Sequence, residues 1–253
     1  MAKKARRVGL AFMAHPDDAE LLCGGALIRL AEAGWELHIA TVTPGDCGTT
    51  TETPWAIGAT RTAEARKAAS LIGATYHCLD ERDGFIVYDK STVRKAMDLF
   101  RIVAPTLVFT NALHDYMVDH EMTALVCRSA SFLHGAPNVS TFPLLAGTII
   151  PHLYYCDPLE GRDALGIEVR PTIVIDISEQ IKRKARMLAC HASQRAWLRA
   201  HHGMDEYLEG MKRHAALRGK QVGCPFAEAF VQHLGHAYPQ DDLLAELFGN
   251  AAG

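Results

Sequence analysis

The chain has 253 residues, of which 49% are apolar and 22% are charged, a composition typical of globular proteins rather than disordered or collagen-like ones. Its formal net charge of -3 argues against nucleic-acid binding, which normally requires a basic surface. No apolar run approaches the roughly 18 residues that a membrane span needs. We therefore expect neither nucleic acid nor membrane as a partner.

The chain opens with a short basic tail that leads into an apolar segment, Val8 to Ala14. This segment is too short for a signal peptide, and no small-residue cleavage site follows it. The 7 cysteines are scattered and form no C-x-x-C pair, which argues against a disulfide framework and against a cysteine-ligated zinc site. These features predict a cytoplasmic protein in a reducing environment.

Short apolar segments alternate along the chain with longer segments of helical periodicity. In chain order the predicted elements are strand Val8–Met13, helix Asp18–Ala33, strand Leu37–Thr43, helix Thr60–Ile72, strand Thr75–Leu79, helix Ser91–Val103, strand Leu107–Thr110, helix His120–Leu133, strands Leu153–Cys156 and Thr172–Ile177, and helices Ser178–Ala200, Met204–Arg218 and Asp241–Phe248. Strand–helix alternation with doubly apolar strands predicts an open α/β fold, its mostly parallel sheet flanked by helices.

We expect one domain over residues 1–253, because no linker or repeat interrupts the sequence. The sheet core is predicted at about residues 7–177. The remainder, about 178–253, is predicted to be a helical C-terminal extension.

The first candidate site is His15-Pro16-Asp17-Asp18, which follows the first predicted strand and opens the first predicted helix. Ligands of open α/β sheets bind beyond the carboxyl ends of strands. Imidazole and carboxylate suit zinc, so His15 and Asp18 can converge on one ion while Asp17 reaches a metal-bound water. A structural alternative is that Asp17 and Glu20 form a capping box.

The second candidate site follows the strand Leu107–Thr110 and contains His114, Asp115, Asp119 and His120. His120 is a candidate third metal ligand, and Asp115 or Asp119 is a candidate partner for its other ring nitrogen. Three protein ligands with an open position are typical of catalytic zinc. Such an ion activates water and polarises a carbonyl, and Asp17 would act as general base and then general acid.

The run from Ala14 to Gly25, AHPDDAELLCGG, resembles the opening motif of the PIG-L (LmbE-like) N-deacetylases. The resemblance extends over most of the chain, through Arg61-x-x-Glu64, Asp83-Gly84, Met117-Val118-Asp119-His120 and His191-x-Ser193-Gln194. It implies a Rossmann-like fold and a zinc-dependent hydrolase that removes N-acetyl groups from small, amino-sugar-like molecules. The native metal could also be iron or another divalent ion, and a homo-oligomer is a further expectation from the family.

The resemblance implies that His15, Asp18 and His120 are metal ligands, that Asp17 is the base, and that Arg61 and Asp83 bind substrate. One departure is Met117, because many members have a histidine there that is thought to stabilise the oxyanion or assist as an acid. Methionine can do neither. Either His114 replaces it, or the metal and Asp17 suffice, or activity has been lost.

Further candidates for the substrate pocket are Trp55, as a lid aromatic, and His236 with Tyr238 in a C-terminal loop. Two other function classes stay open. Met117 favours a non-catalytic protein that binds zinc or a sugar ligand. A Rossmann-type nucleotide binder is the other, although Gly24-Gly25 is no G-x-G-x-x-G fingerprint.

Overall fold

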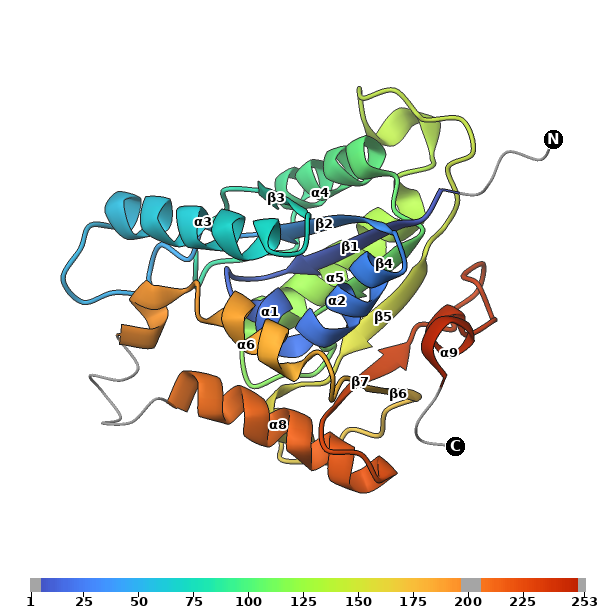
Figure 1. Cartoon of the computed structure of the whole chain (residues 1–253). Coiled ribbons are helices and arrows are strands. Elements are labelled where there is room, and N and C mark those ends of the chain that lie inside the picture. The colour runs from blue at the N-terminus through green and yellow to red at the C-terminus, as the bar shows by residue number, and fades with distance from the viewer. Residues whose placement is uncertain (1–5, 197–205, 250–253) are drawn as a thin grey trace.

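The computed structural model describes residues 6–196 and 206–249, and Figure 1 shows their arrangement. Its sheet has the order β3-β2-β1-β4-β5-β7-β6. The strands are β1 (Val8–Met13), β2 (Glu36–Thr41), β3 (Thr75–Cys78), β4 (Leu107–Thr110), β5 (His152–Cys156), β6 (Ile173–Asp176) and β7 (Ala227–Gln232). The pairs from β3 to β5 are parallel, and β7 is antiparallel to both of its neighbours. The predicted α/β class with a mostly parallel sheet is confirmed.

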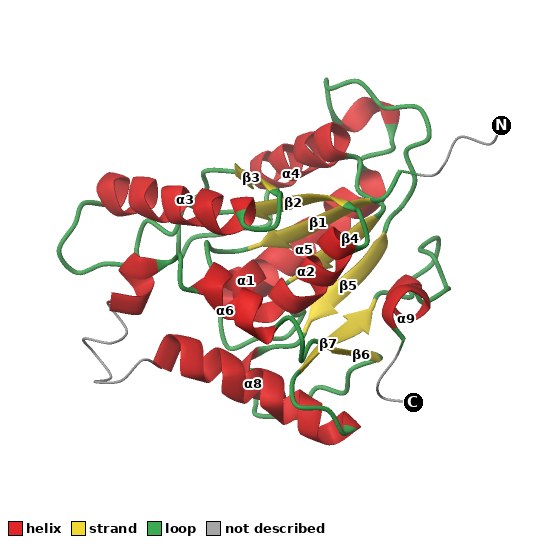
Figure 2. Ribbon diagram, in the orientation of Figure 1, coloured by secondary structure: helices red, strands yellow, loops and turns green. Residues whose placement is uncertain are grey.

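Helices cover both faces of this sheet, as Figure 2 shows. They are α1 (Asp18–Leu22), α2 (Gly24–Glu32), α3 (Pro54–Ser70), α4 (Lys90–Val103), α5 (Val118–Leu133), α6 (Ile181–Leu188), α8 (Glu206–Val222) and α9 (Leu243–Phe248), with short 3-10 turns η1 (Pro137–Val139) and η2 (Leu159–Gly161). Alternate residues of β1 enter different cores: Leu10 and Phe12 pack with α4 and α5, whereas Ala11 and Met13 pack with α1 and α2. Both faces of the strand are therefore apolar, as a covered parallel strand requires.

Three predicted helices differ from the observed ones. The helix predicted at Asp18–Ala33 breaks at Cys23, whose φ of -136° and ψ of 15° are not helical. The helix predicted from Thr60 begins at Pro54 instead, because the Thr53 hydroxyl accepts a hydrogen bond from Ala56 N and caps it. The helix predicted at Ser178–Ala200 is interrupted after α6, and its residues 197–200 lie outside the described part of the chain.

The C-terminal part is not purely helical, which corrects the predicted extension. Strand β7 enters the sheet between β5 and β6. Its sequence, AEAFVQ, contains alanine and glutamate, which favour helices, so local propensity gave the wrong signal. Because β7 runs antiparallel to β5, the loop that follows it lies at the amino edge of the parallel strands.

A buried ion pair anchors β7. The Lys184 Nζ lies 2.6 Å from Glu228 Oε1, and both side chains are almost completely buried. The Glu228 carboxylate also accepts hydrogen bonds of 2.7 Å from the backbone N–H groups of Gly25 and Ala26, in the first turn of α2. One carboxylate therefore ties α2, α6 and β7 together. Among the described residues, no helix is both long and apolar enough to cross a membrane.

We expect Glu228→Gln to lower the free energy of unfolding by about 3–5 kcal/mol, because it leaves the Lys184 ammonium buried without a counter-charge. Urea denaturation followed by circular dichroism measures the effect. The matched control is Glu32→Gln, which breaks the exposed pair with Arg183 and should cost about 0–1 kcal/mol. Equally small losses in both variants would show that the buried pair contributes little.

Candidate active site

The turn between β1 and α1 carries three of the predicted residues. His15 and Asp18 are buried, and the His15 backbone N–H donates to Asp18 Oδ2 at 3.0 Å. Asp17 has a φ of 106°, in the left-handed region, and its side chain makes no capping hydrogen bond. Non-glycine residues adopt this region at an energetic cost and often do so at functional sites. The capping-box alternative is wrong, because Glu20 is buried against His191 instead, 3.3 Å from its Nε2.

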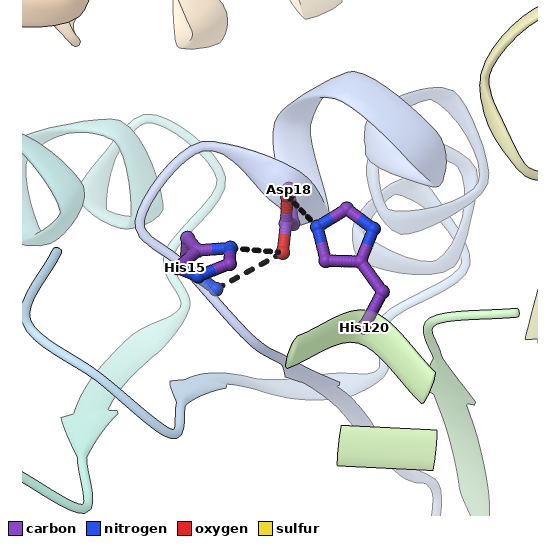
Figure 3. A group of neighbouring side chains, drawn as sticks. All are labelled: His15, Asp18 and His120. Carbon is purple, nitrogen blue, oxygen red and sulfur yellow. Dashed lines mark hydrogen bonds and ion pairs between the residues drawn. The ribbon is translucent and has the colours of Figure 1, made fainter. Parts of the chain in front are cut away.

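His120 comes from the first turn of α5 and faces the same turn. Its Nε2 lies 3.5 Å from Asp18 Oδ1, while His15 Nδ1 lies 3.6 Å from Asp18 Oδ2 (Figure 3). Two donors about 2 Å from a tetrahedral zinc ion would lie roughly 3.3 Å apart. The donor atoms of His15, Asp18 and His120 therefore have the composition and the spacing of a divalent-metal site.

Carboxylates hold the far side of both imidazole rings. Asp115 Oδ1 lies 3.1 Å from His120 Nδ1. His15 Nε2 lies 3.1 Å from Asp83 Oδ1 and 3.2 Å from Asp119 Oδ2. Such partners fix the tautomer of a metal-binding histidine and strengthen it as a ligand. Between the two predicted partners of His120 the structure selects Asp115, and Asp119 serves His15.

Asp119 also fixes a loop. Its carboxylate accepts hydrogen bonds from the backbone N–H groups of Gly84, at 2.7 Å, and Ile86, at 3.2 Å. Asp83 in the same loop accepts from Cys47 N at 3.2 Å. The structure thus places Asp83 and Asp119 behind His15, and Asp83 also lines the cavity.

The electrostatics of this group favour positive charge between the rings. Burial alone would lower the pKa of His120, but Asp18 and Asp115 raise it to about 10. Burial likewise opposes protonation of His15, yet Asp119, Asp18 and Asp83 raise its pKa well above the usual value. Burial would raise the pKa of Asp18, but His120 and His15 hold it well below its usual value. A buried cluster with this surplus of carboxylates suits a divalent cation.

Asp17 sits beside this cluster, held by residues of two other elements. Tyr207 of α8 donates a hydrogen bond of 2.6 Å to Asp17 Oδ2, and the Arg61 Nη2 lies 3.5 Å from the same oxygen. Burial raises the pKa of Asp17, and Asp18 adds to this, whereas Arg61, His191 and the Tyr207 hydroxyl oppose the rise. A carboxyl group with a raised pKa is suited to exchanging protons near neutral pH.

Arg61, predicted to bind substrate, is held within the protein. Its guanidinium donates to the carbonyls of Pro16, at 2.9 Å, and Gly45, at 3.1 Å. Gly45 has a φ of +72°, and a Cβ there would lie 2.3 Å from Arg61 Nη1, so the loop depends on glycine at this position. The arginine therefore positions the turn that carries Asp17.

These residues border a cavity of about 640 Å³, which is the size of a small-molecule site. His15, Asp17, Asp18, Arg61, Asp83 and His120 all line it. So does Met117, at the start of α5, and so does Tyr116. Tyr207 also lines the cavity but was not predicted from the sequence. The only signal for it was its position in a predicted helix of the C-terminal part. Gln194 belongs to the segment His191-x-Ser193-Gln194, which resembles the family sequence. It lines the cavity, and its side-chain amide donates to Gly48 O at 2.9 Å.

Four predicted residues are not brought to this cavity. His114 is exposed and is not among the lining residues, so its side chain does not take the place of a histidine at position 117. Trp55 is 84% exposed in the first turn of α3. His236 follows β7 and so lies at the opposite edge of the sheet. Its neighbour Tyr238 donates to Arg128 O, near the C-terminal end of α5.

Residues 10–131 match the family model described as PIG-L: GlcNAc-PI de-N-acetylase. A 4-oxalmesaconate hydratase from Pseudomonas putida (strain KT2440) is 26% identical over 197 residues, covering 75% of this chain and 74% of that protein. A diacetylchitobiose deacetylase from Thermococcus kodakarensis (strain KOD1) is 25% identical over 188 residues, covering 71% of this chain and 67% of that protein.

Solved structures share the fold over nearly the whole chain. The N,N'-diacetylchitobiose deacetylase from Pyrococcus horikoshii superposes with a TM-score of 0.73 at 22% identity, covering 95% of this chain and 90% of that one. The 4-carboxy-2-hydroxymuconate hydratase from Pseudomonas putida KT2440 gives a TM-score of 0.74 at 22% identity, covering 93% and 100%. At this identity the likeness establishes the fold alone.

We expect Asp119→Asn to weaken zinc binding by about 10- to 100-fold, because the amide removes a negative charge from the far side of His15. Competition with a fluorescent zinc chelator measures the affinity. The control is Asp89→Asn, since asparagine caps α4 as well as aspartate does. Unchanged affinity in Asp119→Asn would contradict the proposed support of the ligand by Asp119.

Proposed function

We propose that this protein is a metal-dependent amide hydrolase that removes an N-acetyl or other N-acyl group from a small, amino-sugar-like substrate. The match of residues 10–131 to the PIG-L family model supports this. The observation that carries the proposal is the position of Asp17. A carboxyl group with a raised pKa stands in the cavity directly beside three clustered donor atoms suited to a divalent metal. Deacetylase relatives with the same fold support it.

His15, Asp18 and His120 would hold the metal. When bound, the ion supplies Lewis-acid polarisation of the amide carbonyl and of water. Two imidazoles and a carboxylate accept zinc and also iron(II), so zinc is the first choice and iron the alternative. Reconstitution of chelated protein with each metal separately distinguishes them.

Asp17 would perform the proton transfers. Tyr207 and Arg61 both contact its Oδ2, so Oδ1 is the oxygen better placed to accept a proton from the attacking water. As the carbon–nitrogen bond breaks, the same group returns this proton to the leaving amine, and the products are a carboxylic acid and an amine. Tyr207 and Arg61 hold the carboxylate in place during both steps.

The hydratase relative suggests a second candidate, addition of water to a carbon–carbon double bond. A substrate with several carboxylates needs cationic side chains to bind it. Among the described residues that line the cavity, Arg61 is the one arginine or lysine, and it is already bonded to two carbonyls. This lining favours an uncharged amide substrate over a polycarboxylate.

A binding protein without catalysis is the remaining alternative, and Met117 is the reason for it. Met117 is 38% exposed and lines the cavity, where many family members place a histidine. The loss of one oxyanion donor typically slows a reaction by roughly 10²–10³-fold without abolishing it. The Asp17 arrangement remains intact, and we therefore favour a slow enzyme.

We expect Asp17→Asn to retain metal and to lower acetate release by roughly 10²–10⁴-fold, since the amide cannot take up the proton. A panel of N-acetylated amino sugars, assayed with and without chelator, provides the measurement, and metal analysis of the same samples is the control. An Asp17→Asn protein with undiminished turnover would exclude Asp17 as the base. Turnover of 4-oxalmesaconate without acetate release from the panel would favour the hydratase.

We expect Met117→His to raise turnover by up to roughly 10²-fold, because an imidazole at this position adds a donor to the cavity. The control is Met117→Leu, which keeps the apolar volume and should leave turnover unchanged. The rates are compared at saturating substrate. If the histidine variant is no faster than wild type, another group already stabilises the transition state.

A further inference from the structure

Asn111 is a buried residue that the proposed function does not use, and it bonds directly to one of the candidate metal ligands. It follows β4 at the carboxyl edge of the sheet, and none of its surface is exposed. Its side-chain oxygen accepts a hydrogen bond of 2.9 Å from Ala14 N. Its side-chain amide donates a hydrogen bond of 3.3 Å to Asp18 Oδ2. One side chain therefore links the end of β4 to the turn that follows β1.

The partners of Asn111 fix the orientation of its amide group. The backbone N–H of Ala14 can only donate, so the Asn111 oxygen faces it, and this turns the Asn111 N–H group towards Asp18. Both hydrogen bonds are buried, and a buried polar group that loses its partner is costly. The amide is therefore held in one orientation before any metal binds.

The two carboxylate oxygens of Asp18 have different surroundings. Oδ2 accepts from His15 N at 3.0 Å as well as from Asn111, so two N–H groups occupy the two lone pairs of that oxygen. At Oδ1 the described residues make one polar contact, with His120 Nε2 at 3.5 Å, and His120 is itself a candidate ligand. Figure 3 shows the contacts of His15 meeting at one oxygen of Asp18 while His120 faces the other.

The number of Asp18 oxygens that bind the ion decides how much room the ion keeps. Carboxylates bind metal ions through one oxygen or through both. Catalytic zinc has three protein ligands and leaves a position for water or substrate. A second oxygen from Asp18 would take up that position, and the hydrogen bonds at Oδ2 oppose this.

We propose that Asn111 is a positioning residue that occupies Asp18 Oδ2, so that Asp18 binds the metal through Oδ1 alone. The inference rests on the metal site of the proposed function, and it is independent of the substrate and of the reaction. Asn111 acts through Asp18 and touches no reacting atom. When the Asn111 N–H group is removed, Oδ2 keeps only the His15 N–H group, and both oxygens of Asp18 can turn towards the ion.

Cobalt(II) in place of zinc tests the proposal, because its visible absorption weakens as the number of ligands rises. The variant is Asn111→Leu, which fills the same space with an apolar group and leaves no room for a water to replace the amide. We expect the visible absorption per bound cobalt to fall below that of the wild-type protein. Circular dichroism checks the fold, and if Asn111→Leu does not fold, Asn111→Ala is measured against the same expectation.

Thr43→Val is the matched control. Thr43 is also completely buried, and its hydroxyl donates to Ala14 O at 3.2 Å, so valine removes a buried bond to the same residue without a change at Asp18. Its cobalt absorption should equal that of the wild-type protein. Unchanged absorption in the Asn111 variant, or an equal loss in Thr43→Val, would overturn the role of Asn111.

The metal site and the reaction are tested separately from this role. Wild-type protein that takes up no cobalt(II) would overturn both the metal site and the inference. Acetate release from the N-acetylated panel is measured on the zinc-loaded wild-type protein. If no acetate is released while Asn111→Leu weakens the cobalt absorption, the hydrolase proposal fails and the role of Asn111 stands. If acetate is released while the absorption is unchanged, the hydrolase proposal stands and the role of Asn111 fails.

Discussion

The site depends on one carboxylate that lies between two imidazole rings. Asp18 contacts His15 through one oxygen and His120 through the other, and each ring has a further carboxylate on its far side. Bringing this many negative groups together in a buried place is costly unless a cation lies among them. The carboxylates raise the pKa values of both histidines for the same reason, because a proton on each ring supplies the positive charge that offsets them. One divalent metal ion would supply the same positive charge.

The topology explains why these groups meet. Strands β1 and β4 are parallel neighbours, so the turns that follow them emerge side by side at the carboxyl edge of the sheet. His15 and Asp18 follow β1, and His120 follows β4. The position of a chemical motif relative to its strand was readable from the sequence, and adjacency of the two strands then brings the motifs together. Predicting that these two turns meet requires the strand order but no knowledge of how distant side chains pack. For this reason the grouping of His15, Asp18 and His120 was predictable.

Residues outside these two turns were less predictable. Asp119 is near His120 in sequence, yet it supports His15, because the direction of a side chain in the first turn of a helix depends on where the helix begins. His236 was misplaced for a topological reason: β7 was read as helical, and an antiparallel strand reverses the edge at which its following loop emerges. Trp55 was misplaced because the Thr53 cap extends α3 back into a stretch that looked like a loop. The sequence of β7 was itself misleading, because a glutamate in the middle of a segment does not suggest a buried strand. Glu228 is buried because its carboxylate accepts hydrogen bonds from Lys184 and from two backbone N–H groups.

The C-terminal part of the chain lies outside residues 10–131, the segment that matches the family model, and it nevertheless completes the site. Helix α8 supplies Tyr207 to Asp17 and one wall of the site cavity. Its position is fixed by Arg218 and Asp157, while β7 and α6 are fixed by Lys184 and Glu228. The turns at the carboxyl edge of β1 and β4 therefore supply the candidate metal ligands, while elements from the other end of the chain help to shape the space beside them. Arg61 of α3 is the one arginine or lysine among the described residues that line this cavity, and its guanidinium already donates to two backbone carbonyls. Under the proposed function, this lining favours an uncharged amide as the reacting group.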